Sequence, residues 1–325
     1  MPKGKIAKVK FPCGQCHHEC KSDCVYCVQC TSWFHSVCEN IKRPELSILS
    51  DNAGDYICSS CCTYHDGSFD FDASLKRLFQ ATGKSEAHLR SVAKTEAVIG
   101  RNVTVPITDD GNFDCVLPTD DTADDILHRV GGSSNKRPVC VPGDGNCLFS
   151  AVSEALTGHT ELANVLRQQT AIELAINGTY YKRKHSEKSF SIVSPSYKVA
   201  CRDAAKNYNY SSAWTIQALS TVIGRDIVSI YPTVNGVADK TVPILHTTIE
   251  PRNKLSRQQL HIMWSSTMSP PPVGIWTPNH FVPLIERKST PIEVTLSPQR
   301  SPEEWPDLPK NLSQNTRSSP LRFDN

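Results

Sequence analysis

The strongest constraint on this chain is a dense group of cysteines near its N-terminus. The 325 residues include 14 cysteines, and ten of these lie between Cys13 and Cys62. A block of about fifty residues is too small to be held by a hydrophobic core alone, so it needs disulfides or bound metal. The chain starts MPKGKIAKVKF, which is basic but lacks the apolar stretch of a secretory signal. We therefore expect an intracellular protein whose clustered cysteines bind metal, with a disulfide-bonded fold as the alternative.

Eight of the possible ligands form four regular pairs. Within each pair two residues separate the ligands: Cys13 and Cys16, Cys27 and Cys30, His35 and Cys38, Cys58 and Cys61. Each such turn places two ligands within reach of one ion, so the spacing predicts two closed tetrahedral zinc sites. Cys20, Cys24 and Cys62 fall outside this spacing. Cys24 could displace a ligand by pairing with Cys27, and Cys61 and Cys62 leave the last ligand open by one position.

The order of these ligands resembles the PHD (plant homeodomain) finger over residues 11–62, and its most specific element is Trp33-Phe34-His35-x2-Cys38. The RING finger uses similar ligands, but the short gap before His35 and the position of Trp33 favour the PHD type. The resemblance implies cross-braced sites, and the opening F-P-C-G-x-C is also similar to PHD fingers of transposon-derived proteins. One zinc would be bound by Cys13, Cys16, His35 and Cys38, the other by Cys27, Cys30, Cys58 and Cys61.

PHD fingers commonly bind histone tails, and those that read methylated lysine use an aromatic cage. Trp33 matches one wall of such a cage. Pro12 occupies a position that is often aromatic in those readers, and the remaining aromatic residues are Phe11 and Tyr26. The sequence therefore leaves the cage incomplete, and a finger that only docks or stabilises is the alternative.

Composition limits what the rest of the chain can be. Lys and Arg number 35 against 33 Asp and Glu, a net charge of +2, which argues against nucleic acid as the main ligand. No apolar run approaches the roughly 18 residues that cross a bilayer, which excludes an integral membrane protein. The hydrophobic share is 38%, so part of the chain should be disordered.

Changes in composition suggest five segments. Residues 1–10 predict a basic flexible arm, and the cysteine-rich segment spans 11–66. Residues 67–134 predict a linker with amphipathic helices, ending in the flexible Gly131-Gly132-Ser133-Ser134. Residues 135–286 alternate strand and helix patterns, and 287–325 predict a disordered Pro/Ser-rich tail.

A candidate nucleophile follows a turn sequence in the fourth segment. Pro142-Gly143-Asp144-Gly145-Asn146 precedes Cys147, which opens an apolar, helix-periodic stretch. A thiol at a helix N-terminus is expected to have a lowered pKa, and the glycines would let amide N–H groups stabilise an oxyanion. His280, at the start of an apolar strand pattern, is the candidate base. Pro283 predicts that this strand lies at a sheet edge or ends there.

The string D-G-N-C-L-F, followed 133 positions after Cys147 by N-H-F, resembles the OTU (ovarian tumour) family of cysteine proteases. The resemblance covers about 137–286 and includes a helix at 214–224 before a strand at 226–231. It implies an α+β or α/β fold, a small mixed sheet flanked by helices near 147–158, 160–176, 197–207 and 213–223. The basic run at 182–185 is expected to be a solvated loop.

The resemblance also implies roles for individual residues. Cys147 would be the nucleophile, His280 the general base and Asp144 the acidic catalytic or loop-shaping residue. Gly145, Asn146 and the Cys147 amide would line the oxyanion hole. Val282 departs from the family, in which Asn or Asp often orients the histidine ring.

Together these features predict a deubiquitinase-type cysteine isopeptidase with two structural zinc ions and no catalytic cofactor. Its partners would be ubiquitin or a ubiquitin-like protein and, through the finger, a histone tail or other peptide. The nucleus is favoured over the cytoplasm. A catalytically silent adaptor that binds ubiquitin or chromatin is the alternative, and a transposon-derived nuclear protein is compatible with either.

Overall fold

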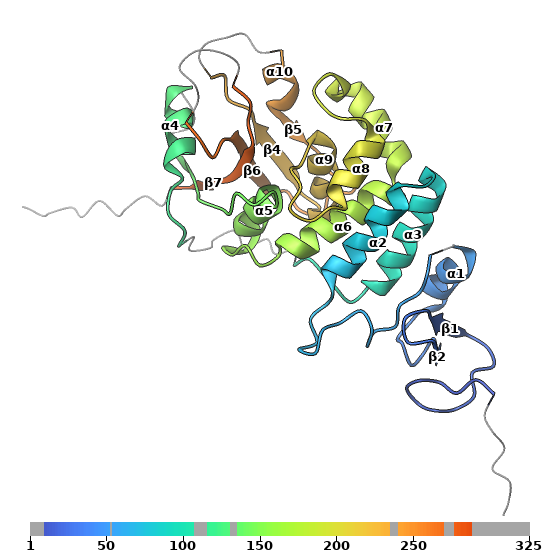
Figure 1. Cartoon of the computed structure of the whole chain (residues 1–325). Helices are drawn as coiled ribbons and strands as arrows, with labels where there is room; N and C mark the ends of the chain where they lie inside the picture. The colour runs from blue at the N-terminus through green and yellow to red at the C-terminus, as the bar shows by residue number, and fades with distance from the viewer. Residues whose placement is uncertain are drawn as a thin grey trace, which may run out of the picture. The chain divides into compact units, whose positions relative to one another are not determined.

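The cysteine-rich segment is built from two short strands and one helix (Figure 1). β1 (Cys24–Cys27) pairs antiparallel with β2 (Ser32–His35), and α1 (Arg43–Asp51) follows. The computed structural model describes residues 10–52, 54–106, 116–130, 135–234, 240–269 and 276–287. The predicted arm before Lys10, the boundary at 131–134 and the tail after Arg287 lie outside these ranges.

The core of this segment consists largely of cysteine. Val25 and Phe34 face each other across the hairpin and are buried, with Ile41, Tyr56 and Ile57 beside them. Cys13, Cys27 and Cys58 are buried in the same cluster. So little apolar volume agrees with the expectation that bound metal would supply part of this segment's stability.

Residues 67–134, expected to be a linker, contain helices that pack into the rest of the protein. α2 (Phe71–Thr82) and α3 (Glu86–Ile99) form a helix pair that contacts α6, and α4 (Asp121–Arg129) follows. Leu75 and Leu89 of the pair share one hydrophobic cluster with Leu174 of α6. The two amphipathic patterns therefore bury their apolar faces against a later helix, which a free linker would not do.

A mixed five-stranded sheet forms the centre of the remaining residues, as predicted. Its spatial order is β3-β7-β6-β4-β5, with β4 and β6 parallel and the other neighbours antiparallel. The strands are β3 (Lys136–Pro138), β4 (Asp226–Ile230), β5 (Thr247–Ile249), β6 (Gln259–Ser265) and β7 (His280–Glu286).

Helices surround this sheet (Figure 1). α5 packs against β6 and β7, and α9 contacts β4, β5 and α6. Four helices occur close to where the sequence predicts them. The full set after β3 is α5 (Cys147–Thr157), α6 (Ala163–Ile176), α7 (Gly178–Glu187), the 3-10 turn η1 (Phe190–Ile192), α8 (Tyr197–Ala204), α9 (Ala213–Ile223) and α10 (Val242–Leu245).

Two local expectations differ from the structure. The basic run at 182–185 belongs to α7, where His185 is buried and stacks on Trp214 with ring centroids 3.5 Å apart. Pro283 lies inside the sheet, since β7 pairs with both β3 and β6. The proline is tolerated because β3 ends at Pro138, opposite Leu284, so the Pro283 nitrogen faces beyond the end of β3. There Val139 N–H donates a hydrogen bond to the Pro283 carbonyl.

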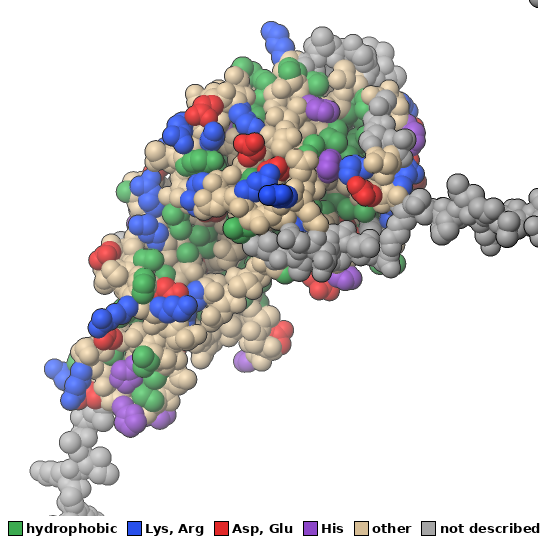
Figure 2. Space-filling model, turned by 180° about the vertical axis from the view of Figure 1, so that it is seen from behind, with side chains coloured by type: hydrophobic (Ala, Val, Ile, Leu, Met, Phe, Trp, Pro, Cys, Tyr) green, Lys and Arg blue, Asp and Glu red, His purple; other side chains and the backbone are tan. Residues whose placement is uncertain are grey.

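On the face shown in Figure 2, basic and acidic side chains are interspersed over the described surface. Among the described residues, no helix combines the length and apolarity that crossing a membrane requires.

Candidate active site and metal centres

Cys147 is the first residue of α5 and follows a tightly packed turn, residues 142–146, called here the Cys147 loop. Gly145 has φ +85°, a left-handed conformation that favours glycine. A Cβ on Gly145 would stand 2.2 Å from the Tyr208 carbonyl oxygen. Both the backbone angle and this close approach require glycine at position 145. The turn that Gly145 allows leads directly into α5, whose N-cap is Asn146 and whose first residue is Cys147.

The Cys147 thiol is buried, with 1% of the residue exposed. Burial raises its pKa, and the nearby Asp144 carboxylate acts in the same direction. The backbone N–H groups of Phe281 and Leu148 lie near the sulfur and oppose this shift without outweighing it. The structure thus reverses the lowered pKa expected from the helix N-terminus, because desolvation exceeds the dipole effect.

His280 is the first residue of β7. The backbone N–H of the next residue, Phe281, lies close to the Cys147 sulfur. It is 3% exposed, and burial lowers its pKa although Asp120 and Asp144 favour the charged form. Its Nδ1 has no hydrogen-bond partner among the described residues. A Cβ on Gly143 would stand 3.8 Å from that Nδ1, so the Cys147 loop passes beside the imidazole. The structure therefore brings Cys147, Asp144 and His280 to one place.

No carboxylate or amide orients the His280 ring within the described residues. Val282 is fully buried, and the Asn279 side chain bonds Thr267 at 2.9 and 3.1 Å. The Asp144 carboxylate accepts a hydrogen bond from Asn146 N–H at 2.8 Å. That bond occupies an amide expected to line the oxyanion hole, which leaves the Cys147 N–H, in the unpaired first turn of α5, as the better donor.

Two further polar groups near the site were not anticipated from the sequence. Ser265 stands directly opposite His280 across β6 and β7, and its Oγ is buried without a partner in the described part of the chain. The Tyr210 hydroxyl is likewise unpaired and close enough to Cys147 for the two to interact electrostatically. Buried polar groups are usually paired, and an unpaired one is explained by strain, by a catalytic role or by a bound water or ion.

Arg167 of α6 bonds the Cys147 loop, a role that was not predicted from the sequence. It is fully buried, and its guanidinium lies over the Phe149 ring at 4.5 Å. Its Nη2 donates to the carbonyls of Gly145 and Asn209 at 2.8 and 2.7 Å. Its Nε donates to Asn146 Oδ1 at 2.5 Å, and its Nη1 to the Lys206 carbonyl at 2.9 Å. Its sequence neighbours Gln168, Gln169 and Thr170 are polar, so no local signal in α6 marks it as buried.

The predicted zinc ligands form two groups of four. Within each group every pair of ligand atoms lies within 4.8 Å: Cys13, Cys16, His35 and Cys38 in one, Cys27, Cys30, Cys58 and Cys61 in the other. A zinc tetrahedron with Zn–S bonds of about 2.3 Å has S···S edges of about 3.8 Å. Cys30 and Cys58 sulfurs are 3.8 Å apart, and Cys16 Sγ is 3.4 Å from His35 Nδ1. The donor types and spacing fit two ions.

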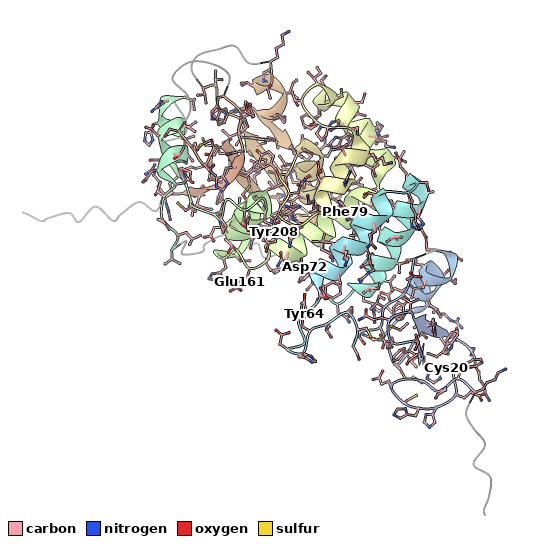
Figure 3. All side chains as sticks on the ribbon, in the orientation of Figure 1. Cys20, Tyr64, Asp72, Phe79, Glu161 and Tyr208 are labelled. Carbon is pink, nitrogen blue, oxygen red and sulfur yellow. The ribbon has the colours of Figure 1, made fainter. Side chains whose placement is uncertain are left out.

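Cys20 and Cys24 lie beside the first group, within 4.8 Å of each other and of a His35 nitrogen. His35 Nε2 is 3.2 Å from the Glu19 carbonyl, so one ring nitrogen faces Cys16 and the other the backbone. Cys20, Cys24 and His35 thus form a third possible ligand group, which shares His35 with the first group of four. Cys20 is labelled in Figure 3.

Three aromatic rings meet on the surface of the cysteine-rich segment. The Trp33 centroid is 5.9 Å from that of Phe11 and 5.3 Å from that of Tyr26. Phe11 is 41% and Tyr26 39% exposed. The three aromatic residues that the sequence offers for a cage thus lie together, because the fold brings Phe11, two positions before Cys13, beside Trp33.

Comparisons with known proteins relate the sheet-containing region to one family. Residues 138–203 and 186–265 match a family model described as Vertnin, OTU domain. The chain is 24% identical to mouse vertnin over 217 residues, covering 60% of this chain and 29% of vertnin. It is 25% identical to zebrafish vertnin over 230 residues, covering 62% and 32%. The chain thus spans about a third of the length of these relatives.

Two solved structures are also similar. The viral OTU domain protease from Dera Ghazi Khan virus is 19% identical with a TM-score of 0.33, covering 47% of this chain and 83% of that one. The OTUD1 OTU domain is 17% identical with a TM-score of 0.30, covering 51% and 93%. The family-model match supports the OTU resemblance of residues 138–265, while a PHD assignment and a transposon origin stay predictions.

Proposed function

We propose that this protein is a deubiquitinase-type cysteine isopeptidase, with Cys147 as nucleophile and His280 as general base. The proposal rests on the position of the Cys147 sulfur, which lies close to the backbone N–H of Phe281. Because Phe281 directly follows His280, the candidate nucleophile and the candidate base lie near each other. The match of residues 138–265 to an OTU domain model adds support. The unpaired His280 Nδ1 leaves one ring nitrogen able to take a proton.

Burial favours the neutral forms of both groups, so the proposed reaction begins from a thiol and a neutral imidazole. His280 removes the thiol proton as the sulfur attacks the carbonyl carbon at the C-terminal glycine of ubiquitin or a ubiquitin-like protein. The developing oxyanion is stabilised by the Cys147 N–H. His280 then protonates the departing lysine amine, and water hydrolyses the resulting thioester.

Hydrolysis of a ubiquitin–lysine isopeptide tests this proposal. Wild type should release free ubiquitin, and Cys147→Ala and His280→Ala should each reduce the rate at least a hundredfold. Cys140→Ala is the matched control, since this partly buried thiol bonds the Thr119 carbonyl and is expected to leave the rate unchanged. A wild-type rate no higher than that of Cys147→Ala would favour the alternative, a silent adaptor that binds ubiquitin.

We further propose that the cysteine-rich segment, loaded with two structural zinc ions, binds a peptide carrying a methylated lysine, such as a histone tail. The group of exposed Phe11 and Tyr26 with half-buried Trp33 favours this role, because a methylammonium ion is attracted to the faces of aromatic rings. A nuclear location belongs to the same proposal.

Titration of the zinc-loaded protein with a trimethyl-lysine peptide and its unmethylated form tests the peptide role. The methylated form should bind more tightly, and Trp33→Ala should remove the difference. Tyr64→Ala is the control, since Tyr64 is exposed but bonds Asp70 instead of joining the three rings. Equal affinity of wild type for both peptides would contradict the cage.

A further inference from the structure

The helix pair α2–α3 is connected to the Cys147 loop through neighbouring residues of α6. While Arg167 bonds the loop, Gln168 Nε2 donates to Ser74 Oγ of α2 at 3.2 Å. The Ser74 hydroxyl donates to the buried Glu96 carboxylate of α3 at 2.6 Å. Two adjacent residues of one helix thus bond the helix pair and the Cys147 loop.

A second connection runs along the surface and bypasses α6. Asn207 Nδ2 donates to Asp72 Oδ1 of α2 at 2.9 Å. Asn146 Nδ2 donates in turn to Asn207 Oδ1 at 2.9 Å. Asn146 directly precedes Cys147, so two hydrogen bonds separate α2 from the residue before the candidate nucleophile.

The segment between these bonds is in close contact with the loop. The carbonyl of Tyr208 lies against Gly145, and Tyr208 itself has φ +60°, which is rare for a residue with a side chain. Figure 3 labels Asp72 near the start of α2 and Tyr208 close to it. A backbone held in this conformation needs fixed neighbours, and Asn207 bonded to Asp72 is one of them.

Asp72, Ser74 and Glu96 all precede residue 138, where the match to the OTU domain model begins. We propose that the helix pair is a supporting part of the candidate active site, and that Asp72 and Asn207 are positioning residues for the Cys147 loop. Their importance for catalysis rests on the proposed function, whereas their effect on the loop does not. Burial of Leu75 and Leu89 explains why the helices pack, but it gives exposed Asp72 no role.

Hydrogen exchange of the full-length protein, measured in the peptide covering residues 143–148, tests this inference. Asp72→Ala should speed exchange there about three- to tenfold, as expected for one lost hydrogen bond. Asp72→Asn should restore slow exchange, because its amide oxygen can still accept from Asn207. Glu86→Ala is the matched control: Glu86 is also an exposed acid in the first turn of its helix, and it bonds Lys182 of α7 away from the loop.

Faster exchange in Asp72→Ala, with slow exchange in Asp72→Asn and Glu86→Ala, supports the inference. Equal exchange in Asp72→Ala and Glu86→Ala would overturn it. Labelling of the same variants with a ubiquitin-derived electrophile separates the two proposals. If wild type is not labelled while the exchange difference persists, the isopeptidase proposal fails and the positioning role stands.

Discussion

Burial sets the protonation of both reacting groups in the candidate site. Because Cys147 and His280 are desolvated together, the charge-separated thiolate–imidazolium pair is disfavoured relative to the neutral pair. In the proposed reaction the histidine would therefore act as a general base during attack and would not hold a preformed ion pair. This difference is visible in how the rate depends on pH.

The acid limb of isopeptide hydrolysis should have its midpoint below pH 6.5, the ordinary pKa of histidine. Burial lowers the pKa of His280, so the imidazole stays neutral and able to accept a proton as the pH falls to 6.5. Rate measurements from pH 5 to 8, with an NMR titration of the imidazole assigned through His280→Gln, check this. A midpoint at or above 6.5 in both experiments would contradict it.

Arg167 should be the most costly single residue to remove from the Cys147 loop. Arg167→Ala leaves the carbonyls of Gly145, Asn209 and Lys206 without this donor and should reduce the free energy of unfolding by more than about 3 kcal/mol. Urea unfolding measures this loss. Arg183→Ala is the control, because its ion pair with Glu187 is exposed and should contribute little to stability. Equal losses in the two variants would refute the role of Arg167.

Cys147 and His280 could be proposed as candidates from the order of their sequence neighbours alone. The Gly-Asn approach to Cys147 and the Asn-His-Phe string needed no knowledge of the fold. Arg167, Ser265 and Tyr210 could not be found in the same way, because their relation to the site exists only once α6, β6 and the 203–210 segment have packed. The direction of the Cys147 pKa shift was missed for the same reason, since desolvation depends on tertiary packing.

At the scale of elements, the sequence and its family resemblance predicted α5, α6, α8 and α9 but missed α7. Charged residues dominate the α7 sequence at 182–184, and its buried positions, Tyr181 and His185, are polar or amphipathic. The extent of the helix pair was also underestimated, since its apolar stripes are short. Their partner on α6 lies about ninety residues further along the chain, beyond the reach of any local pattern.

His185 should make stability depend on pH. Burial lowers its pKa to about 4, against 6.5 unfolded, so the unfolded state binds the proton first. The neutral, buried His185 therefore contributes about 3 kcal/mol to the free energy of unfolding above pH 6.5, and this contribution is lost as the pH falls towards about 4. Urea unfolding at several pH values should show that the free energy of unfolding of His185→Phe falls less on acidification than that of wild type. His128→Gln, at an exposed site, should keep the wild-type slope, and an unchanged slope in His185→Phe would argue against this.

At the scale of the whole molecule, stability comes from two different sources. The sheet and its helices bury an extensive hydrophobic core, whereas the cysteine-rich segment has a small core in which cysteines lie beside a few apolar side chains. Zinc bound by the two groups of four ligands would be coupled to folding, since structural zinc sites have apparent binding free energies of about 10–16 kcal/mol. The two parts should therefore respond differently to chelators.

Elemental analysis of the purified protein should give about two zinc ions per chain, one for each group of four ligands. Cys27→Ser should reduce the count to about one, because one tetrahedron loses a ligand. Cys62→Ser is the control and should leave two, since Cys62 lies outside both groups. A count near zero in wild type would exclude the zinc assignment.

The most direct test of the account is covalent capture of the candidate nucleophile. Ubiquitin carrying an electrophile at its C-terminus should form one adduct with the full-length protein under reducing conditions, located on Cys147 by mass spectrometry. Cys147→Ala should form none, and Cys140→Ala should react like wild type. An unreacted wild type, or an adduct on one of the cysteines between Cys13 and Cys62, would contradict the isopeptidase assignment.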